Sequence, residues 1–203
     1  MSQKEHWEKV FETKQETEVS WYQQLPKTSL DFISKLNISK DAKIIDIGGG
    51  DSYLVDALLE QGFTNITLLD ISAKAIDRIK NRLGAKANKV TFIVSDILDF
   101  NPVETYDLWH DRASFHFQTD AHQIEKYADI VSKAIVNNGH VVIGTFSENG
   151  PKQCSGLDIT QYSEAKMKAV FESKFDLLDS FTEDHATPFD TIQNFIFCSF
   201  KRK

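Results

Sequence analysis

Ile44-Ile45-Asp46-Ile47-Gly48-Gly49-Gly50-Asp51-Ser52 carries the strongest structural signal in this sequence of 203 residues. An apolar run of strand length is followed at once by three glycines, where a strand is expected to turn into a helix. Glycines at such a turn let the backbone pass close to a ligand, where any Cβ would intrude. The same glycines also suit a tight turn that binds nothing, so the loop alone leaves both interpretations open.

From about residue 40, strand-like and helix-like segments alternate along the chain. Short apolar runs predict the strands, and apolar residues at helical spacing predict the helices between them. The expected strands are 43–47, 66–69, 90–94, 106–110 and 140–146, and the expected helices are 51–61, 72–82 and 121–136. Ser72 and Gly84 are the expected N-cap and stop of the second helix. This alternation predicts an α/β fold with a parallel sheet.

The two ends of the chain have a different character. Residues 28–36 predict an amphipathic helix on the sheet, and the residues before it show no clear periodicity, which suits an arm or a lid. Near the other end, a helix at 163–171 precedes two longer strands, 176–184 and 191–200, which could form an antiparallel hairpin at the sheet edge. No repeat or linker divides the chain, which predicts a single domain over residues 1–203.

Composition and charge exclude several classes of protein. The chain is 41% hydrophobic and 26% charged, and its longest apolar runs are too short to cross a membrane. A formal net charge of −7 argues against a nucleic-acid partner, which normally requires a basic patch. The first residues lack the apolar stretch of a secretory signal, and Cys154 and Cys198 form neither a metal spacing nor a disulfide framework. We therefore expect a cytoplasmic protein.

Three aspartates stand at the ends of successive predicted strands. Asp46 lies in the first strand, Asp70 follows the glycine loop by about twenty residues, and Asp96 follows the third strand. Each alone is a common cap or turn residue, but parallel strands bring their carboxyl ends to one crevice, where open α/β sheets bind ligands. An acidic side chain there can bind a pair of ribose hydroxyls, so the three together favour an adenosine-type ligand.

Two details distinguish a nicotinamide dinucleotide from other adenosine ligands. A dinucleotide loop commonly has a further glycine three residues on, and Tyr53 occupies the position three after Gly50. Asp51 would also place negative charge at the helix N-terminus that receives a pyrophosphate. A cofactor without phosphate, carrying an ammonium and a sulfonium group, suits this loop better, which favours S-adenosylmethionine.

Four stretches resemble the motifs of class I S-adenosylmethionine-dependent methyltransferases of the small single-domain type; they are 44–51, 68–72, 95–97 and 106–109. The resemblance implies a Rossmann-like, seven-stranded, mostly parallel sheet with helices on both faces and an antiparallel C-terminal strand. It implies an N-terminal arm or lid and helix at 1–40, a cofactor-binding core at 41–146, and a substrate loop with C-terminal strands at 147–203.

The same resemblance implies roles for individual residues. The residues implied to bind the cofactor are Asp46 in the crevice, Gly48 and Gly50 along the methionine and ribose, Asp70 at the ribose hydroxyls, Asp96 at the adenine amino group, and Ile71 and Ile97 on the adenine faces. Trp7, Phe11 and Trp21 resemble the N-terminal arm of the branch that includes elongation-factor lysine methyltransferases, where aromatic residues cover the cofactor. Alternatively, these aromatics simply pack the N-terminal segment on the domain.

The segment 109–117 is rich in histidine, charged and aromatic residues and follows the fourth strand, where the methyl group would lie. His110 and His116 are candidate proton acceptors, and Arg112 is a candidate to hold an acidic substrate or to structure the loop. Asp111 could orient either. In the alternative, Asp111 and Arg112 form a structural ion pair and the backbone satisfies the histidines. A metal site is not expected, because the two histidines lack the spacing of a helical ligand pair.

A glycine-bounded loop at 147–157 beside the crevice is a candidate substrate wall, and its Cys154 is expected to be a small, partly buried thiol. The sequence thus predicts methyl transfer from S-adenosylmethionine to an unidentified acceptor, a protein lysine or a small molecule. The alternatives are a nucleotide-linked oxidoreductase and a non-catalytic S-adenosylmethionine-binding module. We expect a monomer or weak dimer, with neither a membrane nor nucleic acid as partner.

Overall fold

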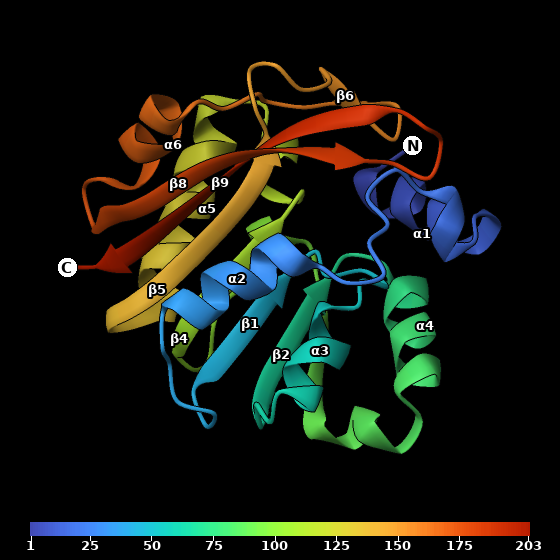
Figure 1. The fold of residues 1–203 in the computed structure, drawn as a ribbon, viewed down its shortest axis with the longest axis horizontal. Coiled ribbons are helices and arrows are strands. Elements are labelled where there is room, and N and C mark those ends of the chain that lie inside the picture. Colours follow the sequence, from blue (N-terminus) through green and yellow to red (C-terminus); the bar gives the residue numbers. More distant parts are fainter.

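The computed structural model describes all residues 1–203, and its centre is a sheet of seven strands in the order β3-β2-β1-β4-β5-β9-β8 (Figure 1). The strands are β1 (Lys43–Ile47), β2 (Asn65–Asp70), β3 (Val90–Val94), β4 (Tyr106–Arg112), β5 (Ile135–Phe146), β8 (Phe175–Ala186) and β9 (Ile192–Arg202). The first five run parallel, whereas β9 is antiparallel to both β5 and β8. The predicted Rossmann-like sheet with a reversed C-terminal strand is confirmed.

Helices cover both faces of this sheet, as predicted (Figure 1). They are α1 (Gln3–Thr13), α2 (Lys27–Lys35), α3 (Leu54–Glu60), α4 (Ala73–Leu83), α5 (Ala121–Ala134) and α6 (Glu164–Phe171). Adjacent residues of β1 face opposite sides, so Ile44 packs in the apolar cluster under α2, α3 and α4, and Ile45 packs in the cluster under α5 and α6. Burial on both faces is what a central parallel strand requires.

The register of the central strands brings several side chains to one edge of the sheet. Asp46 in β1 lies opposite His110 in β4, and Asp70 ends β2 beside the end of β3. The chain crosses from β1 to β2 on one side, and β4 later pairs with the other side of β1, so the strand order reverses at β1. Open α/β sheets bind their ligands at such a switch point.

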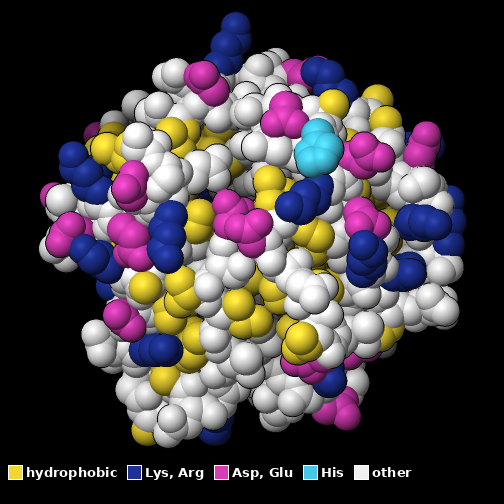
Figure 2. Space-filling view, turned by 180° about the vertical axis from the view of Figure 1, so that it is seen from behind, with side chains coloured by type: hydrophobic (Ala, Val, Ile, Leu, Met, Phe, Trp, Pro, Cys, Tyr) yellow, Lys and Arg dark blue, Asp and Glu magenta, His cyan; other side chains and the backbone are white.

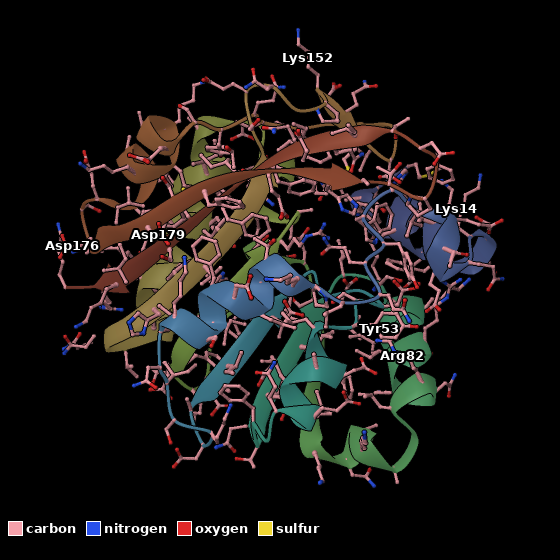
Figure 3. The ribbon with its side chains drawn as sticks, in the orientation of Figure 1. Lys14, Tyr53, Arg82, Lys152, Asp176 and Asp179 are labelled. Carbon is pink, nitrogen blue, oxygen red and sulfur yellow. The ribbon has the colours of Figure 1, made fainter.

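The structure corrects the predicted start of the helix after the glycine loop, because α3 begins at Leu54 and not at Asp51. Arg82 of α4 explains the delay. Its Nη1 donates to the carbonyl of Asp51 and its Nη2 to the carbonyl of Ser52, both at 2.6 Å. These contacts hold the backbone of Asp51 and Ser52 outside the helix. The guanidinium also stacks on Tyr53, 4.1 Å from the ring centroid (Figure 3).

The N-terminal segment, whose sequence shows no clear periodicity, contains the helix α1. Ser2 Oγ accepts a hydrogen bond from the backbone N–H of Glu5 at 3.2 Å, and the Glu5 carboxylate accepts one from the N–H of Ser2 at 2.8 Å. This reciprocal capping box is readable in the sequence as Ser-x-x-Glu. At the other end, the predicted loop at 147–157 contains a small hairpin of β6 (Gln153–Cys154) and β7 (Leu157–Asp158).

Two further features concern the length of the helices and the charges on the surface. None of the helices is long and apolar enough to cross a membrane. On the face shown in Figure 2, basic and acidic side chains are interspersed, without a continuous basic area.

Candidate active site

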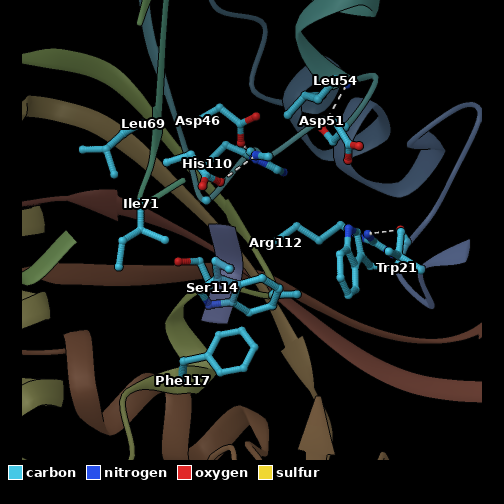
Figure 4. A pocket seen from close by; sticks show the side chains of 18 of the residues that line it. Trp21, Asp46, Asp51, Leu54, Leu69, Ile71, His110, Arg112, Ser114 and Phe117 are labelled. Atoms are coloured by element: carbon cyan, nitrogen blue, oxygen red, sulfur yellow. Dashed lines mark hydrogen bonds and ion pairs between the residues drawn. The ribbon is translucent and has the colours of Figure 1, made fainter. Parts of the chain in front are cut away.

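A pocket lies at the carboxyl ends of β1, β2 and β4, roofed by α1 and the segment that follows it (Figure 4). Of the predicted site residues, eleven line it: Trp7, Trp21, Asp46, Gly48, Gly50, Asp70, Ile71, Asp96, Ile97, His110 and Arg112. His116 is the exception. Segments distant in the sequence therefore converge as expected, and their individual roles remain proposals.

The glycine loop is held in a shape that only glycine tolerates at two positions. Gly48 and Gly50 have φ values of +60° and +52°, in the left-handed region. A Cβ on Gly48 would lie 2.6 Å from the Cβ of Ser114, and a Cβ on Gly50 would lie 3.0 Å from the ring of Phe11. The loop is thus pressed between β4's continuation and α1, and its backbone faces the pocket.

Asp70 is a buried carboxylate that shapes the loop from below. Its Oδ2 accepts from the N–H of Gly50 at 2.9 Å, and its Oδ1 accepts from the N–H of Ser72 at 2.8 Å. Burial raises the pKa of Asp70 to about 7, despite these two hydrogen bonds. The side chain lines the pocket with acceptor capacity left for a ligand, since each carboxylate oxygen can accept more than one hydrogen bond.

Asp96, Ile97 and Ile71 occupy the far end of the pocket, beyond β2 and β3. Asp96 caps a short 3₁₀ turn, where its Oδ1 accepts from the N–H of Leu98 at 2.9 Å. Ile97 is buried and Ile71 is half-buried, so both present apolar surface to the pocket. Two apolar side chains beside one carboxylate suit an adenine ring and its amino group.

His110 is buried between two hydrogen-bond partners. Its Nδ1 lies 2.7 Å from Asp46 Oδ1, and its Nε2 lies 2.9 Å from Ser29 Oγ of α2. A neutral imidazole that donates from Nδ1 to the carboxylate accepts the Ser29 hydroxyl at Nε2. Both ring nitrogens are then in use, so His110 holds Asp46 in place and is not a free proton acceptor. The second carboxylate oxygen, Asp46 Oδ2, is buried in the pocket wall without a partner in the protein.

The structure corrects the assignment of His116 as a proton acceptor. The side chain is fully buried next to Phe146 and does not line the pocket. Burial, together with the charge of Arg112, lowers the pKa of His116 to about 3. A histidine with this environment stays neutral, and its side chain is not exposed to the pocket.

The proposed ion pair between Asp111 and Arg112 does not form. Asp111 Oδ1 accepts from the N–H groups of Ser114 and Phe115 at 2.9 and 3.0 Å, and its Oδ2 accepts from the Tyr127 hydroxyl at 2.6 Å. Asp111 therefore fixes the turn that presses Ser114 against the glycine loop. Arg112 points the other way, toward the roof of the pocket.

Aromatic side chains form this roof. The ring of Trp7 lies 5.7 Å from that of Trp21 and 5.3 Å from that of Phe117, and Phe11 packs beside both tryptophans. All four rings line the pocket, so the arm both packs on the domain and covers the site. Sequence reasoning missed Phe117, whose only signal was its place in the aromatic-rich segment after β4.

Glu8 attaches the roof helix α1 to the N-terminus of α4. Its carboxylate accepts from Ser72 Oγ at 2.9 Å and from the N–H groups of Ala73 and Lys74 at 2.9 and 3.2 Å. A carboxylate at this position satisfies otherwise unpaired N–H groups and interacts favourably with the helix dipole. Glu12, one turn further along α1, makes only an exposed ion pair with Lys74.

Glu8→Ala is therefore expected to loosen α1. A cap of this kind contributes about 1 kcal/mol, which corresponds to roughly a five- to tenfold larger open population. The measurement is the rate of tryptic cleavage after Lys9 or Lys14 in the native protein. Glu12→Ala is the matched control and should leave the rate almost unchanged, since exposed ion pairs contribute little. Equal rates in the two variants would show that Glu8 does not hold the helix.

Comparison with known proteins identifies the family to which this geometry belongs. Residues 38–192 match the sequence model of a family described as a methyltransferase domain. The chain belongs to the class I S-adenosylmethionine-dependent methyltransferases. S-adenosylmethionine is accordingly its cofactor, and the enzyme's pocket lies where the glycine loop and the three strand-end aspartates meet.

Known relatives of this methyltransferase differ in the substrates named for them. It is 30% identical over 146 residues to malonyl-[acyl-carrier protein] O-methyltransferase 1 of Ilyobacter polytropus, covering 71% of this chain and 51% of that one. It is 30% identical over 114 residues to the eEF1A lysine and N-terminal methyltransferase of Mus musculus, covering 54% and 16%. The chain thus spans about half or less of these relatives.

A solved structure of similar fold is the N-methyltransferase NodS from Bradyrhizobium japonicum in complex with S-adenosylhomocysteine. It superimposes with a TM-score of 0.70 at 16% identity, covering 96% of this methyltransferase and 97% of that chain. At this level of identity the likeness concerns the fold.

Proposed function

We propose that this protein transfers the methyl group of S-adenosylmethionine to an acceptor, a protein lysine or a small molecule, bound in the same pocket. The observation that carries the proposal is the convergence of the glycine loop, Asp70 and Asp96 beneath an aromatic roof. The cofactor supplies an activated methyl group on a sulfonium. The protein contributes by placing the acceptor on the axis of that bond in a water-excluding pocket.

The residues fit this cofactor group by group. We infer that Asp70 binds the ribose hydroxyls, that Asp96 binds the adenine amino group, and that Ile71 and Ile97 enclose the ring. The unpartnered Asp46 Oδ2 suits the ammonium of the methionine part, since a buried carboxylate oxygen without a donor is costly. Gly48 and Gly50 leave room for the cofactor along the loop.

The oxidoreductase alternative loses its main requirement in the structure. Tyr53 occupies the place of a further glycine, and Arg82 covers its ring. Asp51, expected to repel a pyrophosphate, forms an ion pair with Arg78 at 3.1 Å and so presents little net charge there. The membership in the methyltransferase family then favours S-adenosylmethionine over a dinucleotide.

The test is calorimetric titration of the purified protein with S-adenosylmethionine, S-adenosylhomocysteine and NAD. Micromolar binding of the first two and none of NAD is expected. Incubation with methyl-labelled S-adenosylmethionine and fractionated cell extract then separates an enzyme from a non-catalytic binding module, which would release no S-adenosylhomocysteine. Binding of NAD alone would overturn the proposal. A cytoplasmic setting, a monomeric or weakly dimeric state and the division of the domain at residues 40 and 146 remain predictions.

Affinity for S-adenosylhomocysteine is expected to fall as the pH drops below about 7. Asp70 has a pKa of about 7 because it is buried, and ribose hydroxyls donate to its charged form. A proton therefore competes with the ribose, and the dissociation constant should rise by up to about tenfold per pH unit. Calorimetry between pH 8 and pH 5.5 measures this, with Asp70→Asn as the variant that should show a flat dependence.

The raised pKa of Asp70 predicts the opposite pH dependence for the stability of the unliganded protein. Its folded-state pKa lies above the ordinary value of 3.8, so the folded state binds the proton more tightly than the unfolded state between these values. The contribution of Asp70 to the free energy of unfolding is therefore present at low pH and is lost as the pH rises through about 7. If the affinity for S-adenosylhomocysteine and the stability of the unliganded protein changed in the same direction with pH, the role given to Asp70 would be contradicted.

A further inference from the structure

Arg112 is the only lysine or arginine among the residues that line the pocket. Its side chain leaves the end of β4 and reaches across the pocket to Trp21 (Figure 4). There Nη1 donates to the carbonyl of Trp21 at 3.0 Å, and the guanidinium lies 4.9 Å from the ring centroid of Phe195. Nε and Nη2 are buried and have no hydrogen-bond partner within the protein.

The surroundings of Arg112 do not neutralise it. Burial lowers its pKa to about 10, so the guanidinium is charged at neutral pH. The charge of Glu183 acts on Arg112, but the carboxylate forms no ion pair with it: Oε2 accepts a hydrogen bond from the Thr28 hydroxyl, and Oε1 is buried without a partner. Cys154 and His185 face the guanidinium as neutral groups, because burial raises the pKa of the thiol to about 12 and lowers that of the imidazole. A buried guanidinium with two unused donors is strongly unfavourable unless something binds there.

The two unused donors have a defined geometry. Nε–H and one N–H of Nη2 lie on the same edge of the planar guanidinium and point in parallel directions. This edge matches the two oxygens of a carboxylate, which arginine binds with two hydrogen bonds. The third group on the guanidinium, Nη1, is already used to hold the roof at Trp21.

We propose that the methyl acceptor is a carboxylic acid and that its carboxylate binds side-on to Nε and Nη2 of Arg112. The proposal rests on the proposed function and names the substrate class of the same pocket. A lysine ammonium is a poor occupant beside this guanidinium, because two like charges repel in a buried site. The acid is therefore favoured over a protein lysine.

We assign this carboxylate to the acceptor, and the amino-acid end of the cofactor, whose ammonium we place at Asp46, is the competing occupant that the titrations below test. The groups that surround the guanidinium come from the segment after α1, from the loop at 147–157 and from β8 and β9. Asp70 and Asp96, which we assign to the adenosine, follow β2 and β3 on the other side of β1 in the strand order. The imidazole of His110 uses both of its nitrogens and is not free to remove a proton, and an acceptor that is already anionic needs no proton removed.

The test uses the full-length protein saturated with S-adenosylhomocysteine. Malonate, succinate and phenylacetate are titrated by ligand-observed NMR at millimolar concentration, each beside its neutral amide. We expect at least one acid to bind at least tenfold more tightly than its amide. Arg112→Met should abolish this preference, Arg112→Lys should retain part of it as a charge without the second donor, and the exposed Lys168→Met should leave it unchanged.

Further titrations distinguish a carboxylate of the acceptor from that of the cofactor. They also distinguish failure of the carboxylic-acid proposal from failure of the proposed function. S-adenosylhomocysteine and 5′-methylthioadenosine, which lacks the amino-acid group, should be weakened by Arg112→Met to the same extent, within about twofold of each other, because loss of the hydrogen bond to Trp21 in the roof acts on both. Retained binding of both also shows that the variant folds. A loss for S-adenosylhomocysteine alone would assign Arg112 to the cofactor and overturn the inference. Wild-type protein that binds S-adenosylhomocysteine but shows no preference for any acid over its amide would likewise overturn it. Failure of the wild type to bind S-adenosylhomocysteine would count against the proposed function itself.

Discussion

Replacement of Asp70 by alanine is expected to weaken S-adenosylhomocysteine binding by about a hundredfold. The substitution removes the acceptor for two ribose hydroxyls and also the acceptor for the N–H of Gly50, which anchors the glycine loop. Hydrogen bonds to a charged group are worth about 1.5–3 kcal/mol each, and about 2.7 kcal/mol corresponds to a hundredfold change in affinity. Calorimetric titration measures the dissociation constant directly.

Asp176→Ala is the matched control for this change, because Asp176 is an exposed carboxylate on β8, far from the pocket (Figure 3). It should bind S-adenosylhomocysteine like the wild type. Circular dichroism of the Asp70→Ala protein checks that the fold is retained. A folded Asp70→Ala protein with wild-type affinity would show that the cofactor does not contact the end of β2.

Replacement of His110 by alanine is expected to lower the free energy of unfolding by about 3 kcal/mol or more. The change removes the only hydrogen-bond donor to a buried carboxylate, and leaving a buried polar group unsatisfied costs about 1–3 kcal/mol, or more when the group is charged. Asp46, beneath the glycine loop, would be left with no hydrogen-bond partner on either oxygen. Denaturant unfolding at neutral pH is the measurement, and weaker cofactor binding should accompany the loss because Asp46 lines the pocket.

Two further variants isolate the cause. Ser29→Ala removes the other partner of the imidazole and should cost only about 1 kcal/mol, the typical value for a neutral hydrogen bond. Adding Asp46→Asn to His110→Ala should recover part of the lost stability, since no buried charge then remains. If the double variant is no more stable than His110→Ala, the carboxylate is not the source of the cost.

The parts of the fold that the sequence predicted well are those with a local cause. The strand at 43–47 and the helix capped by Ser72 follow from short-range apolar spacing and capping chemistry, and both lie where expected. The predicted start of α3 at Asp51 was wrong because the start depends on tertiary contacts. Arg82, on another helix, binds the carbonyls of Asp51 and Ser52. The helix α1 was missed although its capping box is local.

The candidate site divides in the same way. Asp70 and Gly50 could be proposed from motif spacing, and both line the pocket. The position of His110 between Asp46 and Ser29 depends on the parallel register of β1 and β4 and on the placement of α2, neither of which is encoded in a local pattern. His116 sits only six residues after His110, yet packing against Phe146 removes it from the pocket. One stretch of sequence thus contributes residues to two environments.

The glycine loop has no spare room on either side, since Ser114 abuts Gly48 and Phe11 abuts Gly50. In an evolutionary comparison, the conserved unit should therefore be a spatial motif that joins three distant parts of the chain. A bulkier residue at position 114, or a shifted ring at position 11, would displace the loop as surely as a side chain on the glycine itself. A relative that keeps all three glycines but has a larger residue at position 114 would match the glycine motif, and its loop would still be displaced into the cofactor pocket.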